Sequence, residues 1–443
     1  MKRNNIYIIL LVLTTLMPAL QAQDSKDISE IIATGLENNF DLKISRNEQR
    51  ISDNDVTLGN AGFLPTLGLN SGYNMRQSQY DQYPSEGGDV VSSRNDVTQT
   101  LDASINFNMP IFEGFKVQTN YKRLKELQSL GELNTQLDIE NFIAGISAEY
   151  YNYVQQILQM KNIRQAVDLS RERLRIVEAR YQIGDFSRLD LQQARVDFNA
   201  DSSMLIQQYE VVHTSRIKLN EMMGVDNVEQ LFVAADTCIT FDSNLPKDEL
   251  RSDMMMFNTS LLLAQKNKTL SELDLKTLQS QNYPYLRLNA GYGFTHYDYN
   301  SGALDRQRNW GPTAGVTLGF TIFDGFNRKR EQKNARIRIE NRELQVDRQK
   351  LYLQSDFANM WLAYQNNIEL AILEEESLEN AQLNHEIAME RYKVGDLSGI
   401  LLREAQVGLL NAEQRLLNAQ YRVKLYEISL MQISGRIGQL IGE

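Results

Sequence analysis

The chain has 443 residues, of which 42% are apolar, and this composition excludes a wholly disordered protein. Its formal net charge of -11 excludes the broad basic footprint that nucleic acid demands, so no nucleic acid is expected as a partner. Past the N-terminus there is no run of about eighteen apolar residues, so any membrane insertion is expected to use strands. The acidic balance suits cationic cargo, although solvated helix faces would account for it equally well.

The first segment in chain order is a secretory signal, predicted over residues 1–22. Two basic residues precede the apolar stretch Ile6–Leu16, and Ala22 supplies a small residue at the cleavage point. Leu20 makes the small-x-small pattern imperfect, so cleavage one or two residues away is an alternative. The single cysteine, Cys238, lies far from this site, which excludes an acylated N-terminal cysteine and an intramolecular disulfide.

The rest of the chain is internally duplicated. The motif R-Y-x-x-G-D-x-S begins at Arg180 and again at Arg391. Because an internal repeat implies that both halves share one fold, the two halves are predicted together. Each half has the predicted order helix, strand, loop, strand, long helix, turn, helix. The first repeat, the link and the second repeat are predicted at 23–235, 236–246 and 247–443.

Each repeat contains two predicted strands. Apolar and polar residues alternate strictly in all four, as where Leu101 and Ile105 alternate with Asp102 and Asn106. This period is typical of transmembrane β-strands with one face on lipid and one on water. Hairpins packed on a soluble core would alternate similarly, but the sequence leaves no other apolar surface to cover them. The strands are predicted near 65–75, 100–112, 284–295 and 310–323.

Four strands are too few to close a membrane barrel. The smallest transmembrane barrels need about eight strands, and an open edge in lipid leaves backbone groups unsatisfied. The protomer is therefore expected to assemble with other copies, and the pattern itself gives only a multiple of four strands.

Long helices are predicted after each strand pair. Phe326–Val394 contains neither glycine nor proline and would form a helix of roughly 100 Å at about 1.5 Å per residue. In the first repeat, apolar residues recur at every seventh position from Ile146 to Tyr181, which is coiled-coil spacing. Shorter helices, predicted over about 27–60 and 188–223, could stack end to end beside the long ones.

Each long helix ends in the repeated motif, which predicts a turn. Gly184 and Gly395 can adopt the left-handed conformation that ends a helix. Ser187 with Asp190 predicts a capping box for the next helix, whereas Ser398 has no acid at the matching position and should cap more weakly. A soluble helical hairpin would need the same turn chemistry.

The duplicated turn motifs, the strand openings Pro65–Tyr73 and Pro284–Tyr292, and the I-F-[ED]-G-F strand exits together resemble the TolC-like outer-membrane efflux proteins over essentially the whole mature chain. The resemblance implies a mainly α fold with a membrane β-barrel portion. Long coiled-coil helices of an internally duplicated protomer would form a periplasmic α-barrel, and its four strands would join a twelve-stranded barrel in a homotrimer. The resemblance also implies a location in the cell outer membrane, extending into the periplasm.

The resemblance further implies a gate. In that family, aspartates six and nine positions after the glycine of the second motif constrict the periplasmic end. The matching positions after Gly395 are Leu401 and Glu404, so one acid is missing and the other is conservatively replaced. Glu404 and Leu401 are the candidate pore gate, with a solvated surface carboxylate at Glu404 as the alternative.

The family also docks its tunnel tip onto periplasmic adaptor (membrane fusion) proteins, which contact the helix-turn-helix surface. Helix capping alone would account for the same motif residues. The candidate adaptor-docking residues are Arg180, Gly184, Asp185, Ser187, Arg391, Gly395, Asp396 and Ser398.

No catalytic, cofactor or metal site is predicted. His213, His296 and His385 lack the spacing of metal ligands, and the absence of a phosphate-cradling loop means that energy would come from a partner. We therefore expect a passive conduit and not an enzyme.

The favoured function is an efflux duct for small molecules in outer-membrane lipid, coupled by an adaptor to an inner-membrane RND or ABC transporter. Type I protein secretion through the same tunnel is an alternative that the sequence does not separate. A periplasmic coiled-coil scaffold is a less favoured alternative.

Overall fold

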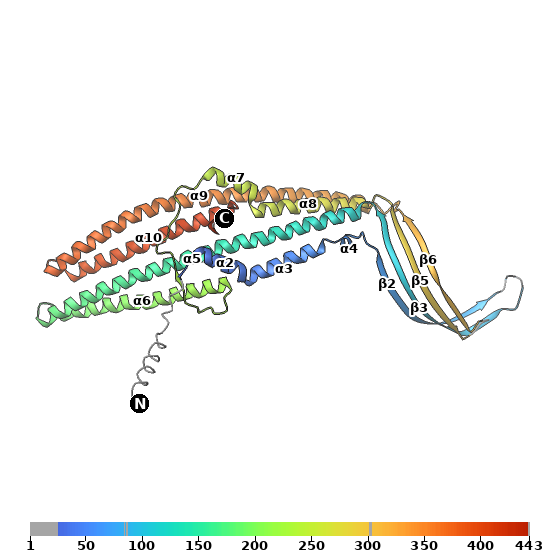
Figure 1. Cartoon of the computed structure of the whole chain (residues 1–443), viewed down its shortest axis with the longest axis horizontal. Coiled ribbons are helices and arrows are strands. Elements are labelled where there is room, and N and C mark those ends of the chain that lie inside the picture. Colours follow the sequence, from blue (N-terminus) through green and yellow to red (C-terminus); the bar gives the residue numbers. More distant parts are fainter. Residues whose placement is uncertain (1–24, 84, 86, 301–303, 442–443) are drawn as a thin grey trace, which may run out of the picture. The chain divides into compact units, whose positions relative to one another are not determined.

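The computed structural model describes residues 25–83, 85, 87–300 and 304–441, and the predicted signal at 1–22 lies outside them (Figure 1). The described part is mainly helical, as predicted. The chain divides into two compact units. The helical unit consists of residues through Arg46, Thr135–Leu261 and residues from Gln349 on, and the strand unit of Asn47–Asn134 and Leu262–Arg348.

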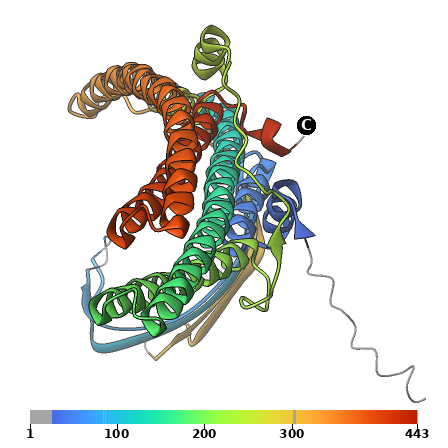
Figure 2. The ribbon, with the colours of Figure 1, turned by 90° about the vertical axis from the view of Figure 1, so that its left-hand side faces the viewer.

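Two helical hairpins lie in the helical unit (Figure 2). α5 (Lys116–Gln182) turns back into α6 (Arg188–Met223), and α9 (Asn327–Val394) turns back into α10 (Gly399–Ile433). The predicted uninterrupted helix ending at Val394 is confirmed, because nothing in its 68 residues breaks the ladder of backbone hydrogen bonds. α5 and α9 each contribute residues to both units.

The prediction of one helix over about 27–60 is wrong. The segment forms α2 (Ile28–Asn38), α3 (Phe40–Asp55) and the short α4 (Leu58–Ala61). The chain breaks at Asn39, whose side-chain oxygen accepts the N–H of Leu42 at 3.1 Å while its amide donates to the main-chain oxygen of Met222 at 3.0 Å. An asparagine that caps a new helix in this way competes with continuation of the old one.

The second repeat breaks its first helix by the same device. α7 (Lys247–Phe257) and α8 (Thr259–Ser280) meet at Asn258. The Asn258 side chain accepts the N–H of Leu261 at 3.1 Å and donates to the oxygen of Ile433 at 3.0 Å. Each break thus depends on a carbonyl at the end of the last helix of its own repeat.

The hydrophobic core of the helical unit lies where α2 packs against α5 and α6. The Tyr153 hydroxyl donates to the oxygen of Phe232 at 2.9 Å, and the Tyr364 hydroxyl donates to the oxygen of Asp242. Burial raises the pKa of Tyr364 to about 12. Both long helices are therefore tied to the segment between α6 and α7. The innermost core residues are Ile31, Ile32, Ile146, Tyr150, Tyr153, Leu219 and Met223.

The strand unit contains one antiparallel sheet in the order β2-β3-β5-β6 (Figure 1). The strands overlap the four predicted ranges. β6 ends at Gly319, short of the predicted 323, because Gly319 already pairs with Tyr285, the first residue of β5. The strands are β2 (Thr66–Gln82), β3 (Val91–Glu113), β5 (Tyr285–Tyr299) and β6 (Arg306–Gly319).

The sheet has one apolar and one polar face. Leu69, Ile105 and Tyr292 stand side by side across three strands, and all three side chains are largely exposed. The adjacent row of paired residues lies on the other face of the sheet. It contains Ser104 between Asn70 and Gly293. The predicted alternation therefore sorts the side chains by face. Among the described residues, no helix is apolar over enough length to cross a bilayer.

Candidate functional site

The turn between α5 and α6 is closed by main-chain hydrogen bonds. Gly184 has φ +82° and donates to the oxygen of Tyr181 at 3.1 Å, while Asp185 donates to the oxygen of Arg180 at 2.9 Å. This pair of bonds around a left-handed glycine is the Schellman motif. Gly395, with φ +86°, closes the second turn with the same two bonds at the same lengths.

The helices that follow the turns are capped as predicted. Ser187 Oγ accepts the N–H of Asp190 at 3.3 Å, and the Asp190 carboxylate accepts the N–H of Ser187 at 3.0 Å. Donation from the Ser187 hydroxyl and N–H lowers the pKa of Asp190. In the second turn, Ser398 accepts the N–H of Leu401 at 3.4 Å and has no reciprocal acid.

The two motif arginines have different partners. Arg180 reaches from the first repeat to the second, where its guanidinium donates to the oxygens of Lys393 at 2.9 Å and Tyr392 at 3.4 Å. Its Cζ also lies 5.2 Å from the ring centroid of Phe186. Among the described residues, Arg391 pairs with the adjacent Asp396 alone, at 2.9 Å on the exposed surface. Arg180 also lies 3.9 Å from the carboxylate of the adjacent Asp185, and its side chain is half-buried. Identical motif positions thus share a local ion pair, and only Arg180 adds a bridge to the other repeat among the described residues.

Several highly exposed side chains at the turns are apolar. Ile183 and Val394, which precede the two left-handed glycines, are each 79% exposed, and Leu189 and Ile400 are 76% and 77% exposed. These aliphatic residues were not predicted, because the repeated motif draws attention to its polar and glycine positions. The available signal was an aliphatic residue immediately before the glycine in both copies.

Two ion pairs lie between the helices next to the turns. Arg403 on α10 donates two hydrogen bonds, each of 2.7 Å, to the carboxylate of Asp201 on α6, whose side chain is 3% exposed. Arg173 on α5 pairs with Asp197 on α6 and donates to the oxygen of Gly399 at 3.4 Å. These contacts join the hairpin of the first repeat to that of the second. Hydrogen bonding to Asp201 raises the pKa of Arg403.

A cavity of about 460 Å³ separates the hairpins at this end. The Tyr392 hydroxyl and Arg173 Nε are buried without a hydrogen-bond partner among the described residues, and burial raises the pKa of Tyr392. No cluster of metal-ligating side chains occurs in the part of the chain that the structure describes. The cavity lining includes Arg173, Val177, Phe186, Asp197, Tyr392 and Arg403.

Comparison with known families decides what this duplicated architecture is. The model of a family described as outer membrane efflux protein matches residues 31–225 and 257–436, which cover most of both repeats. The chain belongs to this family. It is an outer membrane efflux channel protein that extends into the periplasm.

Relatives of this efflux protein align over nearly their full length. It is 21% identical to outer membrane protein TolC of Vibrio cholerae over 429 residues, which cover 94% of this chain and 91% of that protein. It is 20% identical to outer membrane protein TolC of Escherichia coli over 414 residues, covering 91% and 80%.

Solved channels share its fold. The outer membrane protein VceC of Vibrio cholerae superposes with a TM-score of 0.74 at 16% identity, covering 92% of this chain and 96% of that one. The CmeC outer membrane channel of Campylobacter jejuni gives a TM-score of 0.76 at 16% identity, covering 93% and 86%.

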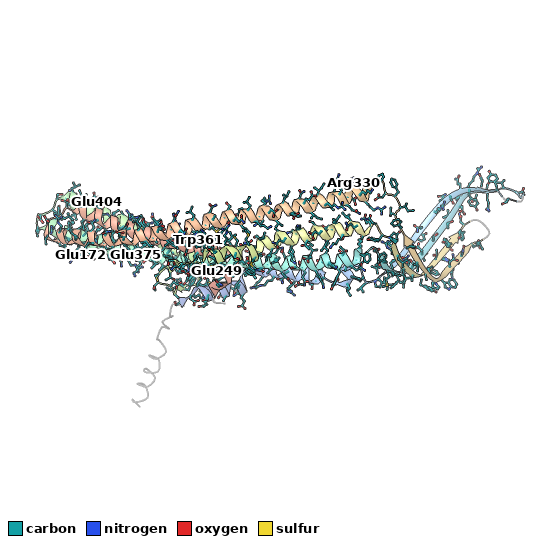
Figure 3. The ribbon with its side chains drawn as sticks, turned by 90° about the horizontal axis from the view of Figure 1, so that it is seen from above. Glu172, Glu249, Arg330, Trp361, Glu375 and Glu404 are labelled. Atoms are coloured by element: carbon teal, nitrogen blue, oxygen red, sulfur yellow. The ribbon has the colours of Figure 1, made fainter. Side chains whose placement is uncertain are left out.

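The candidate gate residues of this efflux protein lie on α10. Leu401 is in its first turn, and its side chain is exposed. Glu404 follows one turn later, and its side chain is also exposed (Figure 3). Glu404 makes no hydrogen bond or ion pair with the other residues that the structure describes. The neighbouring Arg403 instead turns to Asp201.

Proposed function

We propose that three copies of this chain form a duct that carries small molecules out of the cell, delivered by an inner-membrane RND or ABC transporter through a periplasmic adaptor. The observation that supports assembly is the open sheet, and the number of three copies comes from the family to which the chain belongs. β2 and β6 are its two edge strands, and each has one edge without a strand partner among the described residues. Such edges are tolerated in lipid only when other strands satisfy them.

The exposed end of the hairpins supports docking of the adaptor. Ile183 and Val394 are exposed apolar side chains at equivalent positions of the two turns, and the exposed Arg391–Asp396 ion pair lies in the second turn. Gly184, Gly395, Asp185, Ser187 and Ser398 fix the shape of this surface through the turn and cap hydrogen bonds. Apolar centres with polar rims are typical of protein interfaces.

Glu404 and Leu401 are proposed to face the pore when the trimer forms. This proposal is supported by the exposure of both side chains, neither of which takes part in the contacts between the hairpins. A carboxylate without a cationic partner, repeated by symmetry around a narrow pore, would attract cations.

Accumulation of a fluorescent cationic dye tests the proposed function. Cells lacking this protein should accumulate more dye than cells that carry it, at matched growth. Rescue by the intact chain, but not by an Ile183→Asp, Val394→Asp variant that still reaches the outer membrane, would tie export to the docking surface. Unchanged accumulation would contradict export of this cationic dye and favour type I protein secretion or a narrower range of small molecules. The periplasmic scaffold is set aside by membership in a family of outer membrane proteins.

A further inference from the structure

Both junctions between strand and long helix hold a phenylalanine in an unusual backbone conformation. Phe115 and Phe326 have φ +68° and +63°, and they are the non-glycine residues with positive φ in the described part of the chain. This region is strained for an aromatic L-residue. The two rings are nevertheless 55% and 65% exposed, so burial in the protomer does not explain the strain.

The first ring continues the apolar face of the sheet. Along β3 the apolar positions are odd-numbered up to Met109, and then a bulge at Ile111 shifts the register. The bulge places Phe112 beside Leu286, a residue of the apolar face of β5, and so returns Phe112 to that face. Phe115 packs edge-to-face on Phe112 with 5.3 Å between ring centroids.

The second junction repeats the arrangement. Phe326 packs edge-to-face on Phe323 at 5.3 Å between centroids, and Phe323 is itself largely exposed. The first junction therefore extends the apolar face beyond the strands, and both junctions place an exposed pair of aromatic rings between a strand and a long helix.

Basic residues follow both junctions directly, although the whole chain carries a net charge of -11. Lys329 Nζ lies 5.9 Å from the centroid of the Phe326 ring. Lys116 and Lys333 are exposed and form no ion pair with the other described residues. The basic residues before the first acid of each helix are Lys116, Lys122, Arg123 and Lys125 in α5, and Arg328, Lys329 and Arg330 in α9.

We propose that Phe115, Phe326, Lys116, Lys329 and Lys333 form a cationic-aromatic collar that binds the phosphate headgroups of phospholipids at the periplasmic face of the outer membrane. Aromatic rings are favoured at the boundary between the apolar membrane and water. Lysine ammonium groups next to them complement the charge of phosphate. At the first junction the collar continues the apolar face of the sheet. The proposal rests on the outer membrane location, not on the proposed pump or adaptor.

Native mass spectrometry of the full-length protein tests the collar. The protein is purified in detergent, exchanged into mixed micelles with phosphatidylglycerol or phosphatidylcholine, and its retained lipids are counted. The variant Lys116→Gln, Lys329→Gln, Lys333→Gln should bind phosphatidylglycerol more weakly, by about fivefold for each lysine removed. Parallel loss of phosphatidylcholine would show that phosphate itself is recognised, and loss of phosphatidylglycerol alone would show that net charge is recognised.

The matched control changes three exposed lysines of the helical unit: Lys43→Gln, Lys161→Gln, Lys247→Gln. It should retain wild-type amounts of both lipids. Equal retention by the wild type and the collar variant, or equal losses in the collar and control variants, would overturn the phosphate contact. Single-lysine variants give the same comparison should the triple variant fail to assemble.

The aromatic part has its own test. Phe115→Gly with Phe326→Gly places the residue that prefers positive φ at both junctions. If the phenylalanines only shape the turn, this variant should fold and retain lipid as the wild type does, which would overturn their place in the collar. We expect it to fold with the same circular dichroism but to retain less of both lipids.

Discussion

Arg180, near the end of α5, donates a hydrogen bond of 2.9 Å to the main-chain oxygen of Lys393, near the end of α9. A side chain of the first repeat therefore holds the backbone of the matching turn in the second. The second repeat does not return this contact among the described residues: Arg391 pairs with Asp396 beside it, whereas Arg180 makes the bridge in addition to its pair with Asp185. The two turns therefore have the same backbone hydrogen bonds, but they differ in the side-chain contacts that link them to the other repeat.

The second turn should open more often in the Arg180→Ala variant than in the Arg391→Ala variant. The Arg180→Ala change removes a charged hydrogen bond to a main-chain oxygen and a cation-π contact with Phe186, worth about 1–2 kcal/mol together. Hydrogen exchange at the amides of Gly395 and Asp396 should accelerate by roughly tenfold. Arg391→Ala is the matched control, because an exposed pair contributes about 0.5 kcal/mol or less. Equal acceleration in the two variants would contradict the assigned bridge.

Asp201→Ala should lower the free energy of unfolding by about 3 kcal/mol, because it leaves Arg403 partly buried without its carboxylate. Chemical denaturation followed by circular dichroism measures the loss. Asp168→Ala breaks an exposed pair with Arg171 and should cost about 0.5 kcal/mol or less. A double variant, Asp201→Leu with Arg403→Met, should recover much of the loss, and failure to do so would show that the pair is not a self-contained unit.

The helical unit should lose stability in mild acid because of His385. This side chain is buried on α9, with Nε2 lacking a hydrogen-bond partner among the described residues. Burial lowers the pKa of His385, and Glu386 opposes the shift. Since the unfolded chain takes up its proton near pH 6.5, at about the ordinary value, stability falls as pH drops from there through the lower pKa of the folded state.

His385→Leu should weaken this pH dependence, measured as the denaturation midpoint at about pH 7.5 and pH 5. His213→Leu changes an exposed histidine and serves as the control, for which we expect the wild-type dependence. A wild-type pH dependence in the His385→Leu variant would assign the acid sensitivity to other groups.

Glu404→Gln should reduce the block of single-channel current by a multivalent cation in planar bilayers, since it removes the proposed pore carboxylate. Glu375→Gln, which neutralises an exposed carboxylate on α9 (Figure 3), should leave the block unchanged. Equal block in the wild type and the Glu404→Gln variant would place Glu404 on an outer, solvated face of the helix.

Features that depend on neighbours in the chain were predicted well. The end of α9 at Val394 and the capping box of Ser187 with Asp190 were predictable because glycine conformation and cap chemistry act within a few residues. The break at Asn39 was not predicted, because its side chain needs the carbonyl of Met222, 183 positions away. Arg403 and Asp201 are separated by 202 positions, and no local pattern marks them as partners.

The candidate site shows the same division. The sequence motif located both turns but not the bridge from Arg180 to the oxygen of Lys393, because that contact depends on packing between the repeats. The strand alternation was readable because it follows from the pleat. The bulge at Ile111 was not, since it appears only in the pairing with β5.

The β2-β3 hairpin is longer than a membrane requires. β2 has 17 residues and β3 has 23, which correspond to about 58 Å and 78 Å at about 3.4 Å per residue. Even at a tilt of about 45°, both exceed an apolar band of about 25 Å. The surplus lies at the end of the hairpin opposite the start of α5. Since the helices of this outer membrane protein extend into the periplasm, we expect that end to lie outside the cell. An epitope tag inserted at this end should then be accessible to antibodies on living cells.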